Sequence, residues 1–114
     1  MDRLKIEPYD SKYQFDFEIL NREWIEEYFE MEQEDLNILQ NPEDYVIKKG
    51  GEVFFAILEN RVVGTAAMVL TTVGVYELAK MAVNKDYQGM GIGRSLLQRS
   101  IKFALDENLS LIHI

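Results

Sequence analysis

Gln88-Gly89-Met90-Gly91-Ile92-Gly93 places three glycines at alternate positions between an apolar, strand-like run and a strongly helical one. Without a Cβ, the backbone at these positions can turn tightly and approach a ligand closely. The first amides of the helix that follows have no partner inside the helix, and the positive end of the helix dipole lies among them. Such amides bind anions. The stretch therefore predicts a phosphate-binding loop.

The spacing of the glycines excludes two common phosphate loops. A dinucleotide-binding fingerprint needs G-x-G-x-x-G, but its last position is Arg94 when counted from Gly89 and Leu96 when counted from Gly91. A Walker-type loop needs a Gly-Lys pair five residues after Gly89, where this chain has Arg94. What remains is the pattern Gln-x-x-Gly-x-Gly.

That pattern, at Gln88, Gly91 and Gly93, follows the run Glu77-Leu-Ala-Lys-Met-Ala-Val83 and precedes Arg94-Ser-Leu-Leu97. Over residues 75–105 the chain resembles the acetyl-coenzyme A (acetyl-CoA) loop of the GNAT superfamily of N-acetyltransferases. The resemblance implies that backbone groups of the strand contact the pantetheine arm, at Met81, Ala82 and Val83. It also implies that the loop holds the pyrophosphate, through Gln88, Gly89, Met90, Gly91, Ile92, Gly93, Arg94 and Ser95. The alternative is a glycine-rich turn that binds no ligand.

Glu77 is the candidate general base, because several GNAT enzymes carry a Glu at the matching place. A Lys-like amine has a pKa near about 10.4, so a base must take its proton before it attacks at neutral pH. Regular strand alternation puts Glu77 and Ala79 on the same face as Met81 and Val83, although a bulge near the site would change this parity. The alternative for Glu77 is a strand-end carboxylate that faces water or pairs with Lys80.

The order of the predicted elements indicates an α/β fold with a mixed sheet, in which antiparallel strands are followed by a βαβ crossover. Strands are expected at 3–7, 52–58, 61–70, 76–83 and 109–114, and helices at 11–30, 32–40 and 91–108. We expect one GNAT-like domain over residues 1–114. In it, residues 1–74 form the first strand, the acceptor-side helices and the hairpin, and residues 75–114 form the acetyl-CoA-binding unit.

The first helix is expected to begin at a Ser11 cap and to bury one apolar side, in which Trp24 is a core residue rather than a ligand contact. The residues of this side are Phe15, Ile19, Trp24, Ile25, Tyr28 and Phe29. Gly64, inside the second strand of the hairpin, indicates a bulge or a close backbone approach.

Composition narrows the classes of function. The absence of cysteine excludes disulfides, thiolate metal sites and an acyl-enzyme on sulfur, and no cluster of His, Asp and Glu has metal-site spacing, so we expect no metal. A net charge of -8 argues against a nucleic-acid partner. No apolar run is long enough to span a membrane and no signal peptide is recognisable, so a cytoplasmic location is expected. Residues 1–60 carry 16 acidic and 6 basic side chains, which would draw a cationic acceptor toward the first two helices; the alternative is that these residues form solvated acidic helix faces.

The resemblance implies an enzyme that moves an acetyl group from acetyl-CoA to a primary amine, small or lysine-like, by direct attack in a ternary complex. One departure is the end of the chain at Leu111-Ile-His-Ile114, before the helix whose Tyr acts as the acid in many GNAT enzymes. The chain is then C-terminally truncated, or a partner chain or another group completes the site, and a homodimer stays open. The alternatives are a module that binds CoA or acetyl-CoA without turnover, and an interaction domain that binds neither.

Overall fold

A five-stranded mixed sheet forms the centre of the molecule, for which the computed structural model describes residues 3–72, 74–107 and 111–113. The strands are β1 (Lys5–Pro8), β2 (Glu52–Leu58), β3 (Arg61–Thr72), β4 (Val75–Val83) and β5 (Leu111–His113), and they lie in the order β1-β2-β3-β4-β5. The first four pair in antiparallel fashion, and β5 pairs with β4 in parallel. The predicted mixed α/β fold is confirmed, while positions 109, 110 and 114 of the predicted last strand lie outside the described residues.

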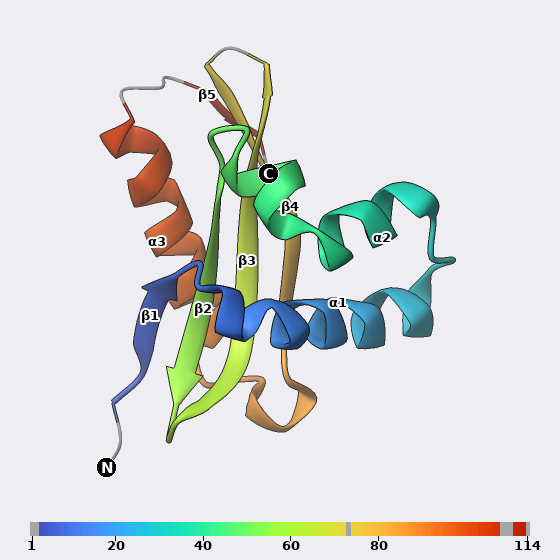
Figure 1. Cartoon of the computed structure of the whole chain (residues 1–114). Coiled ribbons are helices and arrows are strands. Elements are labelled where there is room, and N and C mark those ends of the chain that lie inside the picture. The colour runs from blue at the N-terminus through green and yellow to red at the C-terminus, as the bar shows by residue number, and fades with distance from the viewer. Residues whose placement is uncertain (1–2, 73, 108–110, 114) are drawn as a thin grey trace.

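Helices cover both faces of this sheet (Figure 1). Helices α1 (Gln14–Tyr28) and α2 (Gln33–Gln40) pack on one face with a π-helical turn at Glu43–Ile47, and α3 (Ile92–Asp106) packs on the other. Phe17, Leu39 and Phe55 are buried on the α1 side, whereas Phe54 and Leu96 are buried on the α3 side. All helices in the described ranges are too short or too polar to cross a bilayer.

The start and the buried face of the first helix differ from the sequence prediction. Asp10, not Ser11, supplies the cap: its side chain accepts a hydrogen bond from the Lys12 amide at the start of a 3-10 turn that precedes α1. Of the predicted apolar side only Ile25 is buried, together with Phe17, Leu20 and Asn21, which the prediction omitted. The others are exposed, namely Phe15, Ile19, Trp24, Tyr28 and Phe29. Trp24 is therefore not a core residue.

The described strands show three register shifts, two of which bear on the site. The register between β2 and β3 shifts next to Gly64, which confirms the bulge predicted there, and an added Cβ would lie 3.0 Å from the side chains of Ile92 and Leu96. In β4 the register shifts so that Ala79 has no partner in β3. The prediction that Glu77 and Met81 share a face was wrong, because this second bulge reverses the alternation between them: Met81 and Val83 pack on the α3 side, and Ala79 faces α1 and α2.

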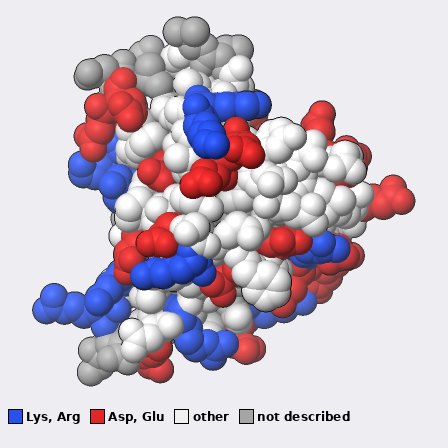
Figure 2. All heavy atoms as spheres, viewed as in Figure 1, with Lys and Arg blue, Asp and Glu red and all other residues white. Residues whose placement is uncertain are grey.

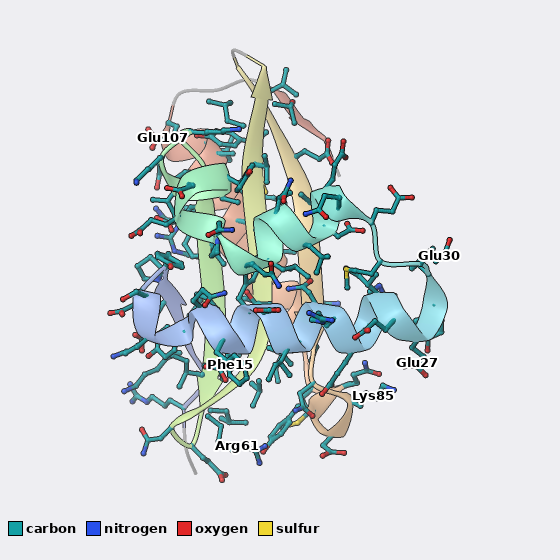
Figure 3. The ribbon with its side chains drawn as sticks, turned by 45° about the vertical axis from the view of Figure 1, so that its right-hand side comes forward. Phe15, Glu27, Glu30, Arg61, Lys85 and Glu107 are labelled. Atoms are coloured by element: carbon teal, nitrogen blue, oxygen red, sulfur yellow. The ribbon has the colours of Figure 1, made fainter. Side chains whose placement is uncertain are left out.

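Two ion pairs attach the helices of the first half to β4 and to the segment after it. The Lys80 ammonium lies 2.9 Å from Asp35 at the start of α2, with only 16% and 23% of the two side chains exposed. Lys85 pairs with Glu27 near the end of α1, and Figure 3 shows the two side chains pointing toward one another. Lys80 thus pairs with Asp35 rather than with Glu77, the partner that the sequence left open.

Replacing Asp35 by Asn is expected to lower the stability by about 1 kcal/mol at pH 7, because it removes the charge that pairs with Lys80 and that strengthens the hydrogen bond from the Glu32 amide in the capping box. Burial raises the pKa of Asp35, but the Lys80 ammonium and the Glu32 amide outweigh burial, so the pKa lies below its ordinary value. Because the pKa of Asp35 is lower in the folded state than in the unfolded state, its carboxylate stabilises the fold at pH values above the unfolded-state pKa of about 3.9. This contribution is lost as the pH falls through the folded-state pKa.

Urea unfolding of wild type and Asp35→Asn at pH 7 and at pH 3 tests this expectation. The free energies of unfolding of the two proteins should differ less at pH 3 than at pH 7. The control Glu34→Gln, which removes a neighbouring exposed carboxylate, should change the free energy of unfolding little at either pH. A difference that is equally large at both pH values would show that the charge of Asp35 is not the cause.

Candidate functional site

The loop before α3 presents a row of free backbone amides. Gly89 and Gly91 both have positive φ angles, of 82° and 81°, which glycine adopts without strain, and Gly91 is the N-cap of α3. Within the described part of the chain, the amides from Gly89 to Arg94 donate to no intramolecular acceptor. The Ser95 amide donates to the Gly91 carbonyl at 3.1 Å, as does its hydroxyl at 3.2 Å. The predicted anion site thus has its donors at 89–94, whereas those of Ser95 are used within the helix.

The β4 strand beside this loop has an open edge. Its pairing with β5 covers only Val75–Glu77 in the described residues. The Asn84 amide donates to the Val63 carbonyl at 2.8 Å. Because hydrogen-bonded and non-hydrogen-bonded pairs alternate in an antiparallel sheet, this bond makes Ala82 and Thr65 a hydrogen-bonded pair, so the amide and carbonyl of Ala82 point toward β3. The intervening residues, Met81 and Val83, direct theirs to the open edge. An extended ligand can therefore pair with Met81 and Val83, whereas the amide and carbonyl of Ala82 belong to the sheet.

A groove of about 290 Å³ joins the open edge of β4 to the glycine loop. Its lining includes all three strand residues expected to contact pantetheine and the loop residues Gln88, Gly89, Gly91, Ile92 and Gly93. The floor is close-packed, since a Cβ on Gly93 would lie 3.2 Å from the Met81 methyl group. The structure therefore brings the two predicted halves of the site together.

Two aromatic residues of this groove were missed by the sequence reasoning. Trp24, which is 44% exposed, reaches the groove from α1 and packs against Tyr28, with the ring centroids 4.5 Å apart and the rings tilted by 49°. Tyr87 lines the groove from the turn after β4, and its hydroxyl accepts a hydrogen bond from Arg61 at 3.3 Å. The only signal for Trp24 is its spacing of four residues from Tyr28, which is equally typical of a buried helix face.

Glu77 lies on the other face of the sheet from α3. Its strand neighbours Tyr76 and Leu78 both pack on the α3 side, so alternation directs Glu77 toward the face covered by α1 and α2. It is half-buried, and no hydrogen bond or ion pair holds its carboxylate within the described ranges. Glu77 precedes the Ala79 bulge by two residues, which is roughly 7 Å along a strand. Its carboxylate is thus separate from the loop but near the point where β4 changes faces.

The charges around the loop suit an anion. Residues Gln88–Ser95 contain no acidic side chain, and Arg94 in the first turn of α3 is exposed, with no carboxylate partner among the described residues. Figure 2 shows acidic side chains at several places on this face of the molecule, among them the end where α1 joins α2. No group of three or more His, Asp or Glu in the described residues is placed to hold a metal ion.

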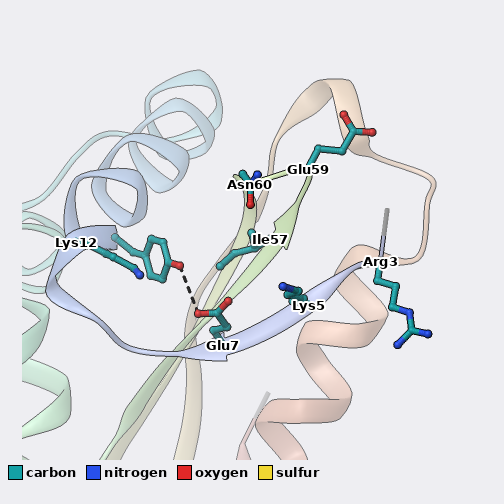
Figure 4. A pocket seen from close by; sticks show the side chains of 8 residues that line it. Arg3, Lys5, Glu7, Lys12, Ile57, Glu59 and Asn60 are labelled. Carbon is teal, nitrogen blue, oxygen red and sulfur yellow. Dashed lines mark hydrogen bonds between the residues drawn. The ribbon is translucent and has the colours of Figure 1, made fainter. Parts of the chain in front are cut away.

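A larger hollow, of about 480 Å³, lies at the β1 edge and is lined by Arg3, Lys5, Glu7 and Lys12 among others (Figure 4). It is open and polar, and a 3.4 Å hydrogen bond from the Tyr13 hydroxyl to Glu7 crosses it. None of the predicted site residues lines this hollow, and it contains no row of free amides. The groove at the glycine loop is therefore the better candidate, although it is smaller.

Among characterised proteins, a 72-residue segment covering 61% of this chain is 38% identical to N-acetylaspartate synthetase of Xenopus tropicalis. The match covers 27% of that protein, so the chain spans only about a quarter of its length.

Solved structures show the same fold. An acetyltransferase of the GNAT family from Staphylococcus aureus Mu50 superposes with a TM-score of 0.85 at 23% identity, over 96% of this chain and 72% of that one. An aminoglycoside N-acetyltransferase solved in complex with CoA superposes with a TM-score of 0.77 at 10% identity, over 99% and 76% of the two chains. The sequence profile of the acetyltransferase (GNAT) family matches residues 17–114. The chain therefore belongs to the acetyltransferase (GNAT) family, a family of acyltransferase enzymes.

Proposed function

We propose that this chain is an N-acetyltransferase that moves the acetyl group of acetyl-CoA to a primary amine by direct attack in a ternary complex. The observation that carries the proposal is the row of free amides from Gly89 to Arg94 at the N-terminus of α3, beside the open edge of β4. A diphosphate accepts hydrogen bonds and carries negative charge, which is what this helix end offers. The CoA in the complex of the aminoglycoside N-acetyltransferase supports the choice of ligand.

The two parts of the groove have different roles in this proposal. The amides of Gly89 to Arg94 bind the pyrophosphate, with Gln88 and the Arg94 side chain at its margins. The outward carbonyl of Met81 and the outward backbone groups of Val83 pair with the pantetheine amides, which leaves the Met81 amide to polarise the thioester carbonyl. A donor aimed at a developing oxyanion contributes about 3 kcal/mol to catalysis. Ala82 lines the groove and Ser95 follows the loop, and neither donates its amide to the ligand.

The chemistry requires one nucleophile and one base. Glu77 first takes a proton from the ammonium form of the acceptor, directly or through a water molecule. The neutral amine then attacks the thioester carbonyl carbon, a C–N bond forms, the C–S bond breaks, and the sulfur leaves as the CoA thiolate, which is neutralised by the second proton that the nitrogen loses on becoming an amide. Direct transfer is consistent with a chain that has no cysteine to carry the acetyl group.

We further propose that residues 1–114 act as one unit, in which residues 1–74 bind the acceptor and residues 75–114 bind the donor. The ion pairs Lys80–Asp35 and Lys85–Glu27 support a single unit, since each joins the first part of the chain to the second. Acetyl-CoA as the donor agrees with the cytoplasmic location expected from the sequence.

Thermal shift with CoA, followed by thiol release from acetyl-CoA over a panel of amines at pH 7 to 9, tests the proposal. We expect CoA to raise the melting temperature and at least one amine to release thiol at a rate that saturates with amine. Stabilisation by CoA without thiol release at any pH would indicate the module that binds CoA without turnover. No effect of CoA at all would remove the site.

A further inference from the structure

A second pocket, the α1–α2 pocket, adjoins the groove on the acceptor side of the sheet. It has a volume of about 310 Å³, and its lining includes Asn21, Trp24, Phe29, Glu30, Glu32 and Ala79. Trp24 also lines the cofactor groove, and Ala79 is the bulged residue two positions before Met81. A molecule in this pocket therefore lies next to the place where the proposed thioester would be bound. Figure 3 shows Glu30 at the other end, where α1 joins α2.

The charges of this pocket do not cancel. The one cationic side chain in its lining, Lys80, is neutralised by Asp35 at 2.9 Å, and the second oxygen of Asp35 accepts the Glu32 amide. The carboxylates of Glu30 and Glu32 remain, with no cationic partner in the described part of the chain. A cationic ligand is attracted to this pocket, whereas a carboxylate ligand would be repelled.

The uncharged lining points to the same class of ligand. Asn21 is only 1% exposed, and its Nδ2 donates to the Phe17 carbonyl at 2.9 Å, while its Oδ1 accepts no hydrogen bond within the described residues. The rings of Trp24 and Phe29 add π-faces, which attract ammonium groups. Apart from the paired Lys80, the Asn21 oxygen, the two glutamates and the aromatic rings of the lining therefore accept hydrogen bonds or attract cations, which suits an ammonium group.

We propose that the α1–α2 pocket binds an ammonium group of a diamine or polyamine acceptor whose other amine attacks the thioester. This inference rests on the proposed transferase function, to which it adds the class of acceptor. The proposal argues against an acidic amino acid as the acceptor. The side-chain carboxylate of such an acceptor would face Glu30 and Glu32, and Lys80, the cation in the described lining, is already paired with Asp35.

Binding of spermidine in the absence of acetyl-CoA tests the pocket without relying on turnover. Isothermal titration should show saturable binding to wild type that weakens at least about tenfold in the double variant Glu30→Gln and Glu32→Gln. Gln at position 32 can still accept the hydrogen bond of the capping box. The matched control, Glu34→Gln with Glu43→Gln, removes the same charge from exposed positions outside the pocket and should change the affinity less than about twofold. Equal affinities for the two double variants, or no binding to wild type, would overturn the proposal.

Measurements of turnover then test the acceptor class and the transferase function separately. With acetyl-CoA, butane-1,4-diamine should give a kcat/KM at least about tenfold above that of butylamine, and the Glu30/Glu32 variant should reduce this ratio toward one by raising KM. Equal rates with the two amines, or faster release with aspartate, would refute the acceptor class while keeping the transferase. Absence of thiol release with every amine would refute the transferase, and spermidine binding that depends on Glu30 and Glu32 would still support the pocket.

Discussion

Replacing Gly91 by Asp is expected to weaken CoA binding by roughly 100-fold, or about 3 kcal/mol, because it places a carboxylate among the amides that would bind pyrophosphate. Gly91 has a φ of 81°, and an added Cβ would meet no atom within 4 Å. Asp and Asn enter this left-handed region more readily than other residues with a Cβ. The variant should therefore fold while opposing the ligand by charge.

The matched control is Gly91→Asn. Asn has nearly the same shape as Asp and adopts a positive φ about as readily, but it carries no charge. The two variants should have similar melting temperatures without ligand, and Asn should bind CoA much more tightly than Asp when both are measured by isothermal titration at low salt. The difference in CoA affinity between the two variants should decrease as the salt concentration is raised, because salt screens the repulsion between the introduced carboxylate and the ligand. Equal CoA affinities for Asp and Asn would mean that the loop does not hold the diphosphate.

The second large effect is expected from Glu77→Gln, which keeps the size of the side chain and removes the proposed base. At pH 7 the rate of thiol release should fall about 100-fold, the typical contribution of a positioned base. CoA affinity should not change, because Glu77 lies away from the loop and faces α1 and α2. The difference in rate between the variant and wild type should become smaller as the pH approaches the pKa of the amine, because more of the acceptor is then already deprotonated in solution.

Thiol release between pH 6.5 and pH 10 tests this expectation, with Glu59→Gln at the exposed β2–β3 turn as the control. A loss that is the same at every pH would assign Glu77 a structural role. No loss at pH 7 would leave the proton to water or to another group, and would restore the interpretation of Glu77 as a strand-end carboxylate.

The differences between expectation and structure have a common physical origin. The first helix carries aromatic residues on more than one side, and burial selects Phe17 and Leu20 because that side meets β2 and β3, while Trp24 extends beyond them to the groove. Likewise, nothing in the run from Glu77 to Val83 marks Ala79 as a bulge, because a bulge results from the register that β3 imposes. The α1–α2 pocket depends on both, since its lining combines α1, the start of α2 and the bulge.

The sequence by itself determined the glycine loop with its free amides, the helix that follows it and the mixed sheet, because these depend on glycines, helix-end amides and side-chain periodicity within a few neighbouring residues. The tertiary structure alone decided which face Glu77 and Met81 occupy, that Lys80 pairs with Asp35, and that Trp24 lines both the groove at the loop and the acidic α1–α2 pocket. Those features are contacts between segments far apart in the chain. Their geometry follows from strand register and from where each helix meets the sheet, which no local pattern encodes.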